Sequence, residues 1–168
     1  EIGRALISMG HRRIGIISGP VNSFNSQKRL VGIQQALFEA SIPYNVGTTV
    51  IGDWTRECGY HAASQLLSQG VTAIYAFSDK MISGVYTYCI EHRISVGKDI
   101  SLFGFDDSDI VHAYTPPLAS AKPDLQEMGH KAAELVLAQL QGKTVCTKCH
   151  VLPCTIHVRP SVCSIGEA

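Results

Sequence analysis

Four short apolar or β-branched runs recur along the chain, and each is followed by a polar turn. The runs are Ile14–Ile17, Thr48–Ile51, Val71–Phe77 and Ser101–Phe105. Apolar residues at successive rather than alternate positions are typical of strands buried on both faces of a parallel sheet. Because helical patterns separate the runs, the sequence predicts an α/β fold with a doubly wound, mostly parallel sheet.

Helical periodicity predicts helices over about residues 27–40, 56–69, 80–92 and 124–141, after a short helix end at 2–9. Ser26, Thr55 and Ser78-Asp79 are expected to cap the first three of these. Residues 118–122 and 154–158 are expected to be extended. The helix at 124–141 follows a break at Pro116-Pro117, and we expect it to belong to a second lobe.

Composition excludes several classes of protein. Of the 168 residues, 45% are apolar and 17% are charged, which predicts a filled core rather than disorder. Lys plus Arg equals Asp plus Glu, 14 against 14, so the chain lacks the basic surface of a self-sufficient nucleic-acid binder. No apolar run approaches the roughly 18 residues of a membrane span, and residues 1–13 do not read as a signal peptide. The chain begins in mid-helix, which we interpret as a fragment.

Polar and aromatic residues cluster where the predicted strands end. Ser18, Trp54, Ser78 and Asp106 follow the four strands, and Arg29 lies in the first turns of the next helix. In a doubly wound sheet the ligand crevice lies beyond the carboxyl ends of the strands. Carboxylates and a guanidinium bind vicinal hydroxyls, and an aromatic face covers a sugar ring. These residues therefore predict a site for a neutral polyhydroxylated ligand.

Each of these residues also has a purely structural interpretation. Arg29 is also typical of a solvated helix surface, and Trp54 of packing at a strand end. Asp79 is expected to cap a helix rather than to bind a ligand. Asp106 and Asp107 also suit a turn. Their joint position at strand ends is what favours the binding site.

Six cysteines raise the question of a metal or a haem. Cys146, Cys149 and His150 form a CxxCH pattern, and with Cys154 or Cys163 they have spacing compatible with zinc. A single CxxC pair without a second one is a weak zinc signal, and the chain has no export signal for haem attachment. We therefore expect free thiols, no metal and no cofactor. The sequence also lacks the GxGxxG, GxxxxGK, HExxH and nucleophile-elbow motifs, so we expect no enzyme activity.

A string of motifs resembles the effector-binding region of the lactose-repressor (LacI/GalR) family of bacterial transcription regulators. The resemblance covers residues 1–162 and rests on GHRRIGIISGP, SQKRLVGIQQAL, GDWTRECGYHAASQLL, AIYAFSDKMISGV, VGKDISLFGFDD, TPPLASAKPDLQEMGHKAAELVLAQL and LPCTIHVRPS, in this order. It implies a type I periplasmic-binding-protein-like fold of two lobes, with an effector between them. The chain would be the C-terminal lobe, with most of the N-terminal lobe absent.

The resemblance also implies a division of the chain. Residues 1–9 would end a helix of the missing lobe, and residues 10–115 would form the C-terminal effector-binding lobe. Residues 116–145 would cross to the N-terminal lobe and form its helix, whose apolar face would then be exposed here. Residues 146–168 would form a return strand and the tail.

Functional roles follow from the resemblance as expectations. Arg29 matches the family's effector-clamping arginine, Trp54 an aromatic that stacks on sugar, and Asp106 the first of its paired acids. Ser78 stands where the family usually has Asn, and Pro123 and Leu125 stand where some members have an amide or aromatic ligand. The implied function is allosteric control of a cytoplasmic repressor, a homodimer that binds operator DNA through a helix-turn-helix absent from this chain. The alternative is a periplasmic sugar-binding protein of a transport system.

Overall fold

A six-stranded sheet forms the centre of the molecule. The computed structural model describes residues 1–143 and 150–165. The strands lie in the order β2-β1-β3-β4-β5-β6, and all neighbours are parallel except β6, which runs antiparallel to β5. This arrangement confirms the predicted mostly parallel α/β sheet. The strands are β1 Ile14–Ser18, β2 Thr49–Ile51, β3 Ala73–Ala76, β4 Ser101–Phe105, β5 Ala119–Pro123 and β6 Cys154–His157.

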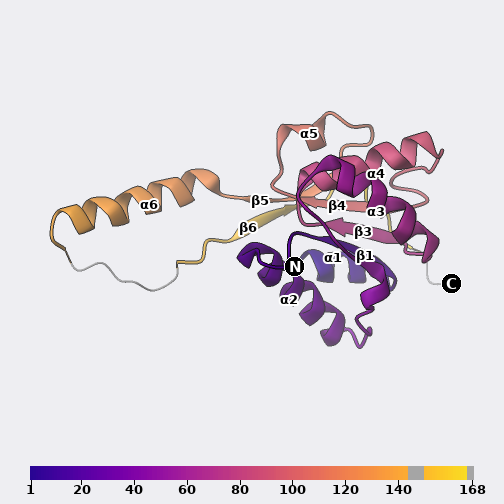
Figure 1. Cartoon of the computed structure of the whole chain (residues 1–168), viewed down its shortest axis with the longest axis horizontal. Coiled ribbons are helices and arrows are strands. Elements are labelled where there is room, and N and C mark those ends of the chain that lie inside the picture. The colour runs from indigo at the N-terminus through magenta and orange to yellow at the C-terminus, as the bar shows by residue number, and fades with distance from the viewer. Residues whose placement is uncertain (144–149, 166–168) are drawn as a thin grey trace.

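Helices cover both faces of this sheet. α1 and α2 pack together on one face, and α3 and α4 pack together on the other (Figure 1). The chain moves outward from β1 to β2 on one side and from β3 to β4 on the other, so the winding reverses between β1 and β3. The helices are α1 Ile2–Ser8, α2 Phe24–Glu39, α3 Arg56–Ser68, α4 Asp79–Glu91, α5 Asp109–His112 and α6 Leu125–Leu140, with a short 3-10 turn at Val46–Thr48.

The core lies between the sheet and these helices. Every residue of β3 is buried, as the unbroken apolar run predicted. α3 and α4 approach each other closely because each presents a glycine to the other's backbone. A Cβ at Gly59 would overlap the Met81 carbonyl, and one at Gly84 would overlap the Arg56 carbonyl. Larger residues at either position would force the two helices apart.

The start of α2 differs from the prediction. Ser23, rather than Ser26, is the N-cap, and its Oγ accepts a hydrogen bond from the Ser26 N–H at 3.3 Å. Ser26 lies inside the helix, where its buried hydroxyl donates to the Gly19 carbonyl and accepts from the Gly19 N–H, both at 3.0 Å. The helix therefore begins one turn earlier than its apolar stripe indicated.

α1 is packed differently from the expectation that residues 1–9 belong to a missing lobe. Ile2 and Leu6 are buried in the same core as the sheet. Gly3 lies against Ile33 and Ala36 of α2, so closely that a Cβ there would overlap both side chains. The division expected at residue 10 is corrected, since α1 is an integral part of the helical layer over β1.

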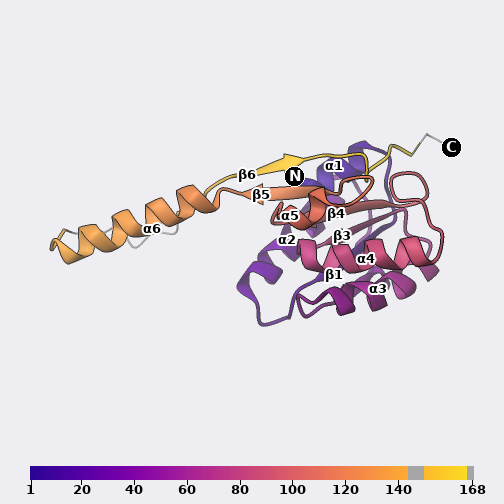
Figure 2. The same ribbon diagram turned by 90° about the horizontal axis from the view of Figure 1, so that it is seen from above.

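The chain leaves the sheet later than expected. Residues 119–123 were assigned to the crossover, but they form β5, which pairs with β4. Beyond them α6 stands apart from the sheet, joined to it by β5 and β6 (Figure 2). None of its residues is buried, and its apolar face is exposed, as the sequence predicted. Among the described residues, no helix is both long enough and apolar enough to cross a membrane.

Candidate functional site

A cavity of about 390 Å³ opens at the carboxyl edge of the sheet. It lies where the winding reverses, beyond the ends of β1, β3 and β4. Four of the predicted residues meet there, namely Arg29, Trp54, Ser78 and Asp106. The complete lining is Asn25, Arg29, Trp54, Ser78, Asp79, Lys80, Asp106 and Ser108. We call this cavity the effector hollow.

Arg29 is held in place by two contacts with the ends of neighbouring strands. Its Nη1 donates a hydrogen bond to the carbonyl of Phe77, just beyond β3. Its guanidinium carbon lies 3.5 Å from the centre of the Phe105 ring, at the end of β4. Stacking of this kind fixes the plane of the guanidinium. Its Nε and Nη2 have no acceptor within the described part of the chain, so they are available to a ligand.

Trp54 lies over the end of β1. Its backbone has a φ of 70°, a left-handed conformation that non-glycine residues seldom adopt. The six-membered ring of the indole packs so closely on Gly19 that a Cβ there would overlap it. The absence of a side chain at Gly19 therefore lets the half-buried indole pack against the end of β1 where it lines the effector hollow.

Two carboxylates lie near each other with different roles. Asp79 is buried and accepts hydrogen bonds from the Ser108 N–H at 2.7 Å, the Ser108 hydroxyl at 2.9 Å and the Ser120 hydroxyl at 2.7 Å. Asp106 is exposed at the hollow, and no side chain among residues 1–143 and 150–165 donates a hydrogen bond to its carboxylate, on which the backbone N–H of Asp79 acts. Asp79 therefore holds neighbouring elements together, and Asp106 is free to bind a ligand.

The surroundings of the two acids raise the pKa of each above its ordinary value. Burial raises the pKa of Asp79, although its hydrogen bonds oppose that shift. Partial desolvation raises the pKa of Asp106, and the charge of Asp79 adds to the effect, while the Arg29 guanidinium opposes it. A hydrogen bond donated by a ligand hydroxyl to the Asp106 carboxylate would stabilise its ionised form.

The two predicted serines are placed differently. Ser78 lines the hollow, but its Oγ already accepts from the Met81 N–H at 3.3 Å as the N-cap of α4. Ser18 is outside the hollow, because its buried hydroxyl donates to the carbonyls of Gly19 and Val50. The prediction of Ser18 as a binding residue is therefore corrected, since its hydroxyl faces the strand backbone rather than the cavity.

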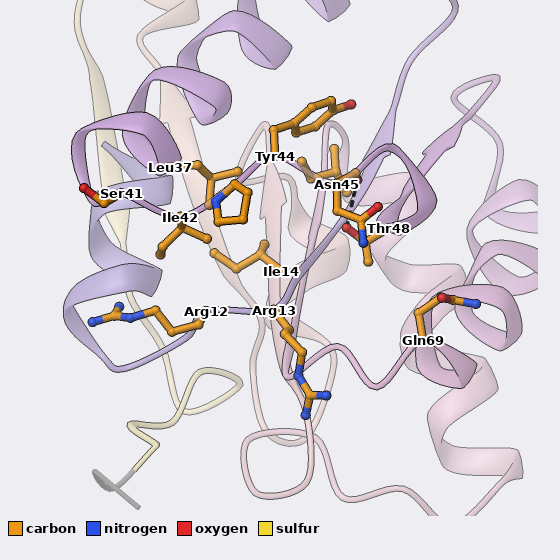
Figure 3. A pocket seen from close by; sticks show the side chains of 12 residues that line it. Arg12, Arg13, Ile14, Leu37, Ser41, Ile42, Tyr44, Asn45, Thr48 and Gln69 are labelled. Carbon is orange, nitrogen blue, oxygen red and sulfur yellow. Dashed lines mark hydrogen bonds between the residues drawn. The ribbon is translucent and has the colours of Figure 1, made fainter.

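A second cavity, of about 400 Å³, lies at the opposite edge of the sheet (Figure 3). Arg12 and Arg13 extend in different directions at this cavity, and the apolar side chains of Leu37 and Ile42 also line it. α1, α2 and α3 all end at this edge, and helix C-termini attract cations. Arg12 accordingly donates to the Ile7 carbonyl at 2.9 Å. A helix end thus accounts for Arg12, and the effector hollow, where four of the predicted residues meet, is the candidate site.

Sequence comparison places this geometry in a known family. Residues 4–162 match the family described as "Periplasmic binding protein-like domain". The chain belongs to this family, in its LacI-type branch. The chain is 34% identical over 158 residues to the transcriptional repressor CytR of Escherichia coli and 31% identical over 142 residues to its lactose operon repressor. The ribose operon repressor of Haemophilus influenzae is 32% identical over 164 residues.

Solved LacI-type structures share the fold. The regulator CelR in its cellobiose complex has a TM-score of 0.89 and 31% identity, with 95% of this chain and 49% of that chain covered. The regulator CcpA of Lactococcus lactis has a TM-score of 0.90 and 26% identity, with 96% and 59% covered. The matches to CytR, the lactose repressor and the ribose repressor cover 93%, 83% and 96% of this chain, but only 46%, 39% and 49% of those proteins. The chain thus spans about half the length of these LacI-type relatives.

Three residues of the hollow were not found by sequence reasoning. Asn25 lies one helical turn before Arg29, so the i, i+4 spacing was a usable signal. Lys80 is in the first turn of α4, and Ser108 comes two residues after Asp106. Lys80 lies inside the motif AIYAFSDKMISGV, whereas Asn25 and Ser108 lie one residue outside the motifs on which the prediction rested.

The zinc alternative depends on residues that are largely outside the described part of the chain. Cys146 and Cys149 lie outside the described residues, whereas His150 and Cys154 are among them. Among the described residues, no group of three or more His, Cys, Asp or Glu side chains could hold a metal ion. Cys58, Cys89, Cys154 and Cys163 are free thiols.

Proposed function

We propose that this chain is the effector-binding part of a transcriptional repressor that controls operator binding allosterically. The effector would be a sugar or related polyhydroxylated metabolite. The observation that supports this most is the convergence of an oriented guanidinium, a free carboxylate and a flat indole in one hollow. Together they supply donors, an acceptor and an apolar face for a sugar ring.

The solvent-exposed apolar face of α6 supports the proposal of a two-lobed protein. Leu125, Val136, Leu137 and Leu140 are all exposed on a helix that stands away from the sheet. A second lobe packed on this helix would close over the effector hollow. Effector binding would then shift the equilibrium between open and closed arrangements of the lobes. A helix-turn-helix outside this chain would respond by binding operator DNA more or less tightly. The whole protein would be a cytoplasmic homodimer.

The alternative, a periplasmic sugar-binding protein, shares the fold but has less support. The relatives named above are repressors, and the solved neighbours are transcriptional regulators. The sequence encoded upstream of residue 1 separates the two functions. A helix-turn-helix there supports the repressor, whereas a signal peptide supports the transport protein.

A thermal-shift screen of the full-length protein tests the proposal. Lactose, D-ribose, cellobiose and the nucleoside cytidine are suitable probes, because a bound effector raises the unfolding temperature. A sugar or nucleoside that raises it is then titrated by calorimetry into wild-type protein and Arg29→Met. Loss of at least one charge-assisted hydrogen bond should weaken binding by about 1.5–3 kcal/mol.

The neighbouring residue provides a matched control. Lys28 lies on the same helix, and its ammonium group lies over the Phe24 ring rather than in the hollow. Lys28→Met should therefore bind the effector as wild type does. Equal affinity of Arg29→Met and wild type would remove Arg29 from the site, and no shift with any probe would argue against a sugar effector.

A further inference from the structure

The second acid of the Asp106-Asp107 pair points away from the effector hollow into an ion-pair cluster. The Asp107 side chain is only 3% exposed. Its Oδ1 lies 2.7 Å from Arg159 Nη2, and its Oδ2 lies 3.0 Å from His157 Nδ1. His112 of α5 approaches Oδ1 at 3.7 Å. Desolvation alone would raise the pKa of Asp107, but Arg159 and His157 hold it below its ordinary value.

Arg159 and His157 come from the far end of the chain. His157 is the last residue of β6 and is paired in register with Ser120 of β5. Arg159 also donates from Nη1 to the Leu118 carbonyl at 2.7 Å, just before β5. The carboxylate of Asp107 therefore joins the loop after β4 directly to β6 and, through Arg159, to the residue before β5.

The backbone of this loop is strained. Asp106 has a φ of 114° and Asp107 a φ of 51°, two successive non-glycine residues outside the favoured regions. Such conformations persist only where surrounding contacts hold them. On one side of the loop Asp79 accepts a hydrogen bond from the Ser108 N–H, and on the other side Asp107 is ion-paired with Arg159. The Asp107 N–H also donates to Ser120 Oγ at 3.1 Å.

Asp106 depends on these contacts for its position. The backbone of the loop, in which the Asp106 N–H donates to the Ala121 carbonyl at 2.8 Å, directs this side chain toward the hollow, where the Asp79 N–H and the Arg29 guanidinium act on its carboxylate. We propose that Asp107, paired with His157 of β6 and with Arg159 just after that strand, is the positioning residue for the Asp106 carboxylate. This inference rests on the proposed function of the hollow as an effector site.

The cluster also lies at the base of the connection to α6. β5 leaves the sheet toward α6, and β6 returns from that direction (Figures 1 and 2). Asp107 contacts both strands, with its carboxylate on His157 of β6 and its N–H on Ser120 of β5, and therefore connects the loop that carries Asp106 to the segment that carries α6. Release of this contact would leave the loop after β4 free to relax from its strained conformation.

A double-mutant cycle in the full-length protein tests the positioning role. The titrant is the sugar from the lactose, D-ribose and cellobiose screen that gives the largest thermal shift. Asp107→Asn should weaken its binding about tenfold in the wild-type background, but less than twofold in the Asp106→Asn background, because the residue acts through Asp106. A tenfold loss in both backgrounds, or no loss in either, would overturn the inference.

A second measurement needs no effector. Carbon-13 NMR can follow the titration of the Asp106 carboxyl in wild type and in Arg159→Gln. Removal of a positive charge would by electrostatics alone raise the pKa of Asp106, whereas release of the loop from its partly desolvated position would lower it. We expect a lower pKa, and an unchanged or higher one would contradict a positioning role.

The double-mutant cycle and the NMR titration together distinguish failure of the inference from failure of the proposed function. If none of the three sugars binds but the Asp106 pKa falls in Arg159→Gln, the positioning role stands and the sugar effector is lost. Glu39→Gln is the control, since it removes an exposed ion pair with Arg4 far from the cluster. It should leave both sugar affinity and the Asp106 titration unchanged. If Asp107→Asn does not fold, Arg159→Gln replaces it in the double-mutant cycle.

Discussion

At the scale of single residues, strained backbone collects at the carboxyl edge of the sheet. Trp54, Asp106 and Asp107 all have positive φ values without being glycine. Such conformations cost about 1–3 kcal/mol each and are found mainly at functional sites. Two of these residues, Trp54 and Asp106, line the effector hollow, and the third is anchored beside it. The strained backbone conformations are therefore found at the residues that line the effector hollow or lie beside it.

Gly19→Ala should displace the indole of Trp54. A Cβ at position 19 would overlap the ring, which has to move toward solvent. Trp54 is the only tryptophan in the sequence, so intrinsic fluorescence reports on it alone. We expect the emission maximum to move to longer wavelength and the effector affinity to fall. Calorimetry with the sugar selected in the screen measures the second effect.

Gly32→Ala is the matched control for this substitution. Position 32 is on the exposed side of α2, and a Cβ there meets no atom within 4 Å. The alanine should stabilise the helix by about 0.5–1 kcal/mol and leave the emission spectrum unchanged. If Gly19→Ala gave the same spectrum as Gly32→Ala, the close packing of Trp54 on β1 would be wrong.

At the scale of elements, α6 differs from every other long helix. α2, α3 and α4 each bury one face, whereas α6 buries no residue. Helices gain most of their stability from packing of an apolar face, so α6 contributes little to the sheet unit. Its Asp124 cap, which accepts from the Glu127 N–H at 2.9 Å, and the Lys131–Glu134 pair at 2.9 Å support it locally.

The same substitution in α6 and in α3 should have very different costs. Leu137 of α6 is 57% exposed, whereas Leu66 of α3 is fully buried. Leu137→Ala should change the free energy of unfolding of the 168-residue chain by less than about 0.5 kcal/mol. Leu66→Ala should lower it by about 2–5 kcal/mol. Urea unfolding followed by Trp54 fluorescence makes the comparison, and similar losses in both variants would show that α6 packs on the sheet unit.

At the scale of the whole molecule, a buried histidine ties the two ends of the fold together. His11 is fully buried, just before β1. Its Nε2 lies 3.0 Å from the Cys163 carbonyl, so Nε2 carries the proton and donates. Its Nδ1 then accepts from the Thr72 hydroxyl at 2.9 Å. The neutral ring thus joins β1, the start of β3 and the C-terminal segment.

Stability should therefore fall with acidification through His11. Burial lowers the pKa of His11 in the folded protein, so the unfolded chain binds the proton more readily. Its contribution is complete above the unfolded pKa of about 6.5 and is lost as the pH falls through and below that value. Urea unfolding at pH 7.5 and 5.5 should show a larger loss for wild type than for His11→Gln. Equal losses in the two proteins would assign the pH dependence to other groups.

The sequence alone was sufficient for what depends on neighbours in the chain. Unbroken apolar runs mark strands buried on both faces, Thr55 and Ser78 mark helix starts, and strand ends mark the edge where Arg29, Trp54 and Asp106 meet. These features follow from local periodicity and from the geometry of parallel sheets.

Only the tertiary structure decided which polar groups are already engaged. Ser18, Asp79 and Asp107 resemble ligand-binding residues in the sequence, but each is hydrogen-bonded or ion-paired to groups distant in the chain. The packing of α1 on α2 and the pairing of β6 with β5 were likewise set by long-range contacts. Hydrogen bonds and apolar burial between distant segments leave no periodic trace in the sequence, which is why the position of Asp106 at the hollow could be predicted and the pairing of Asp107 with Arg159 could not.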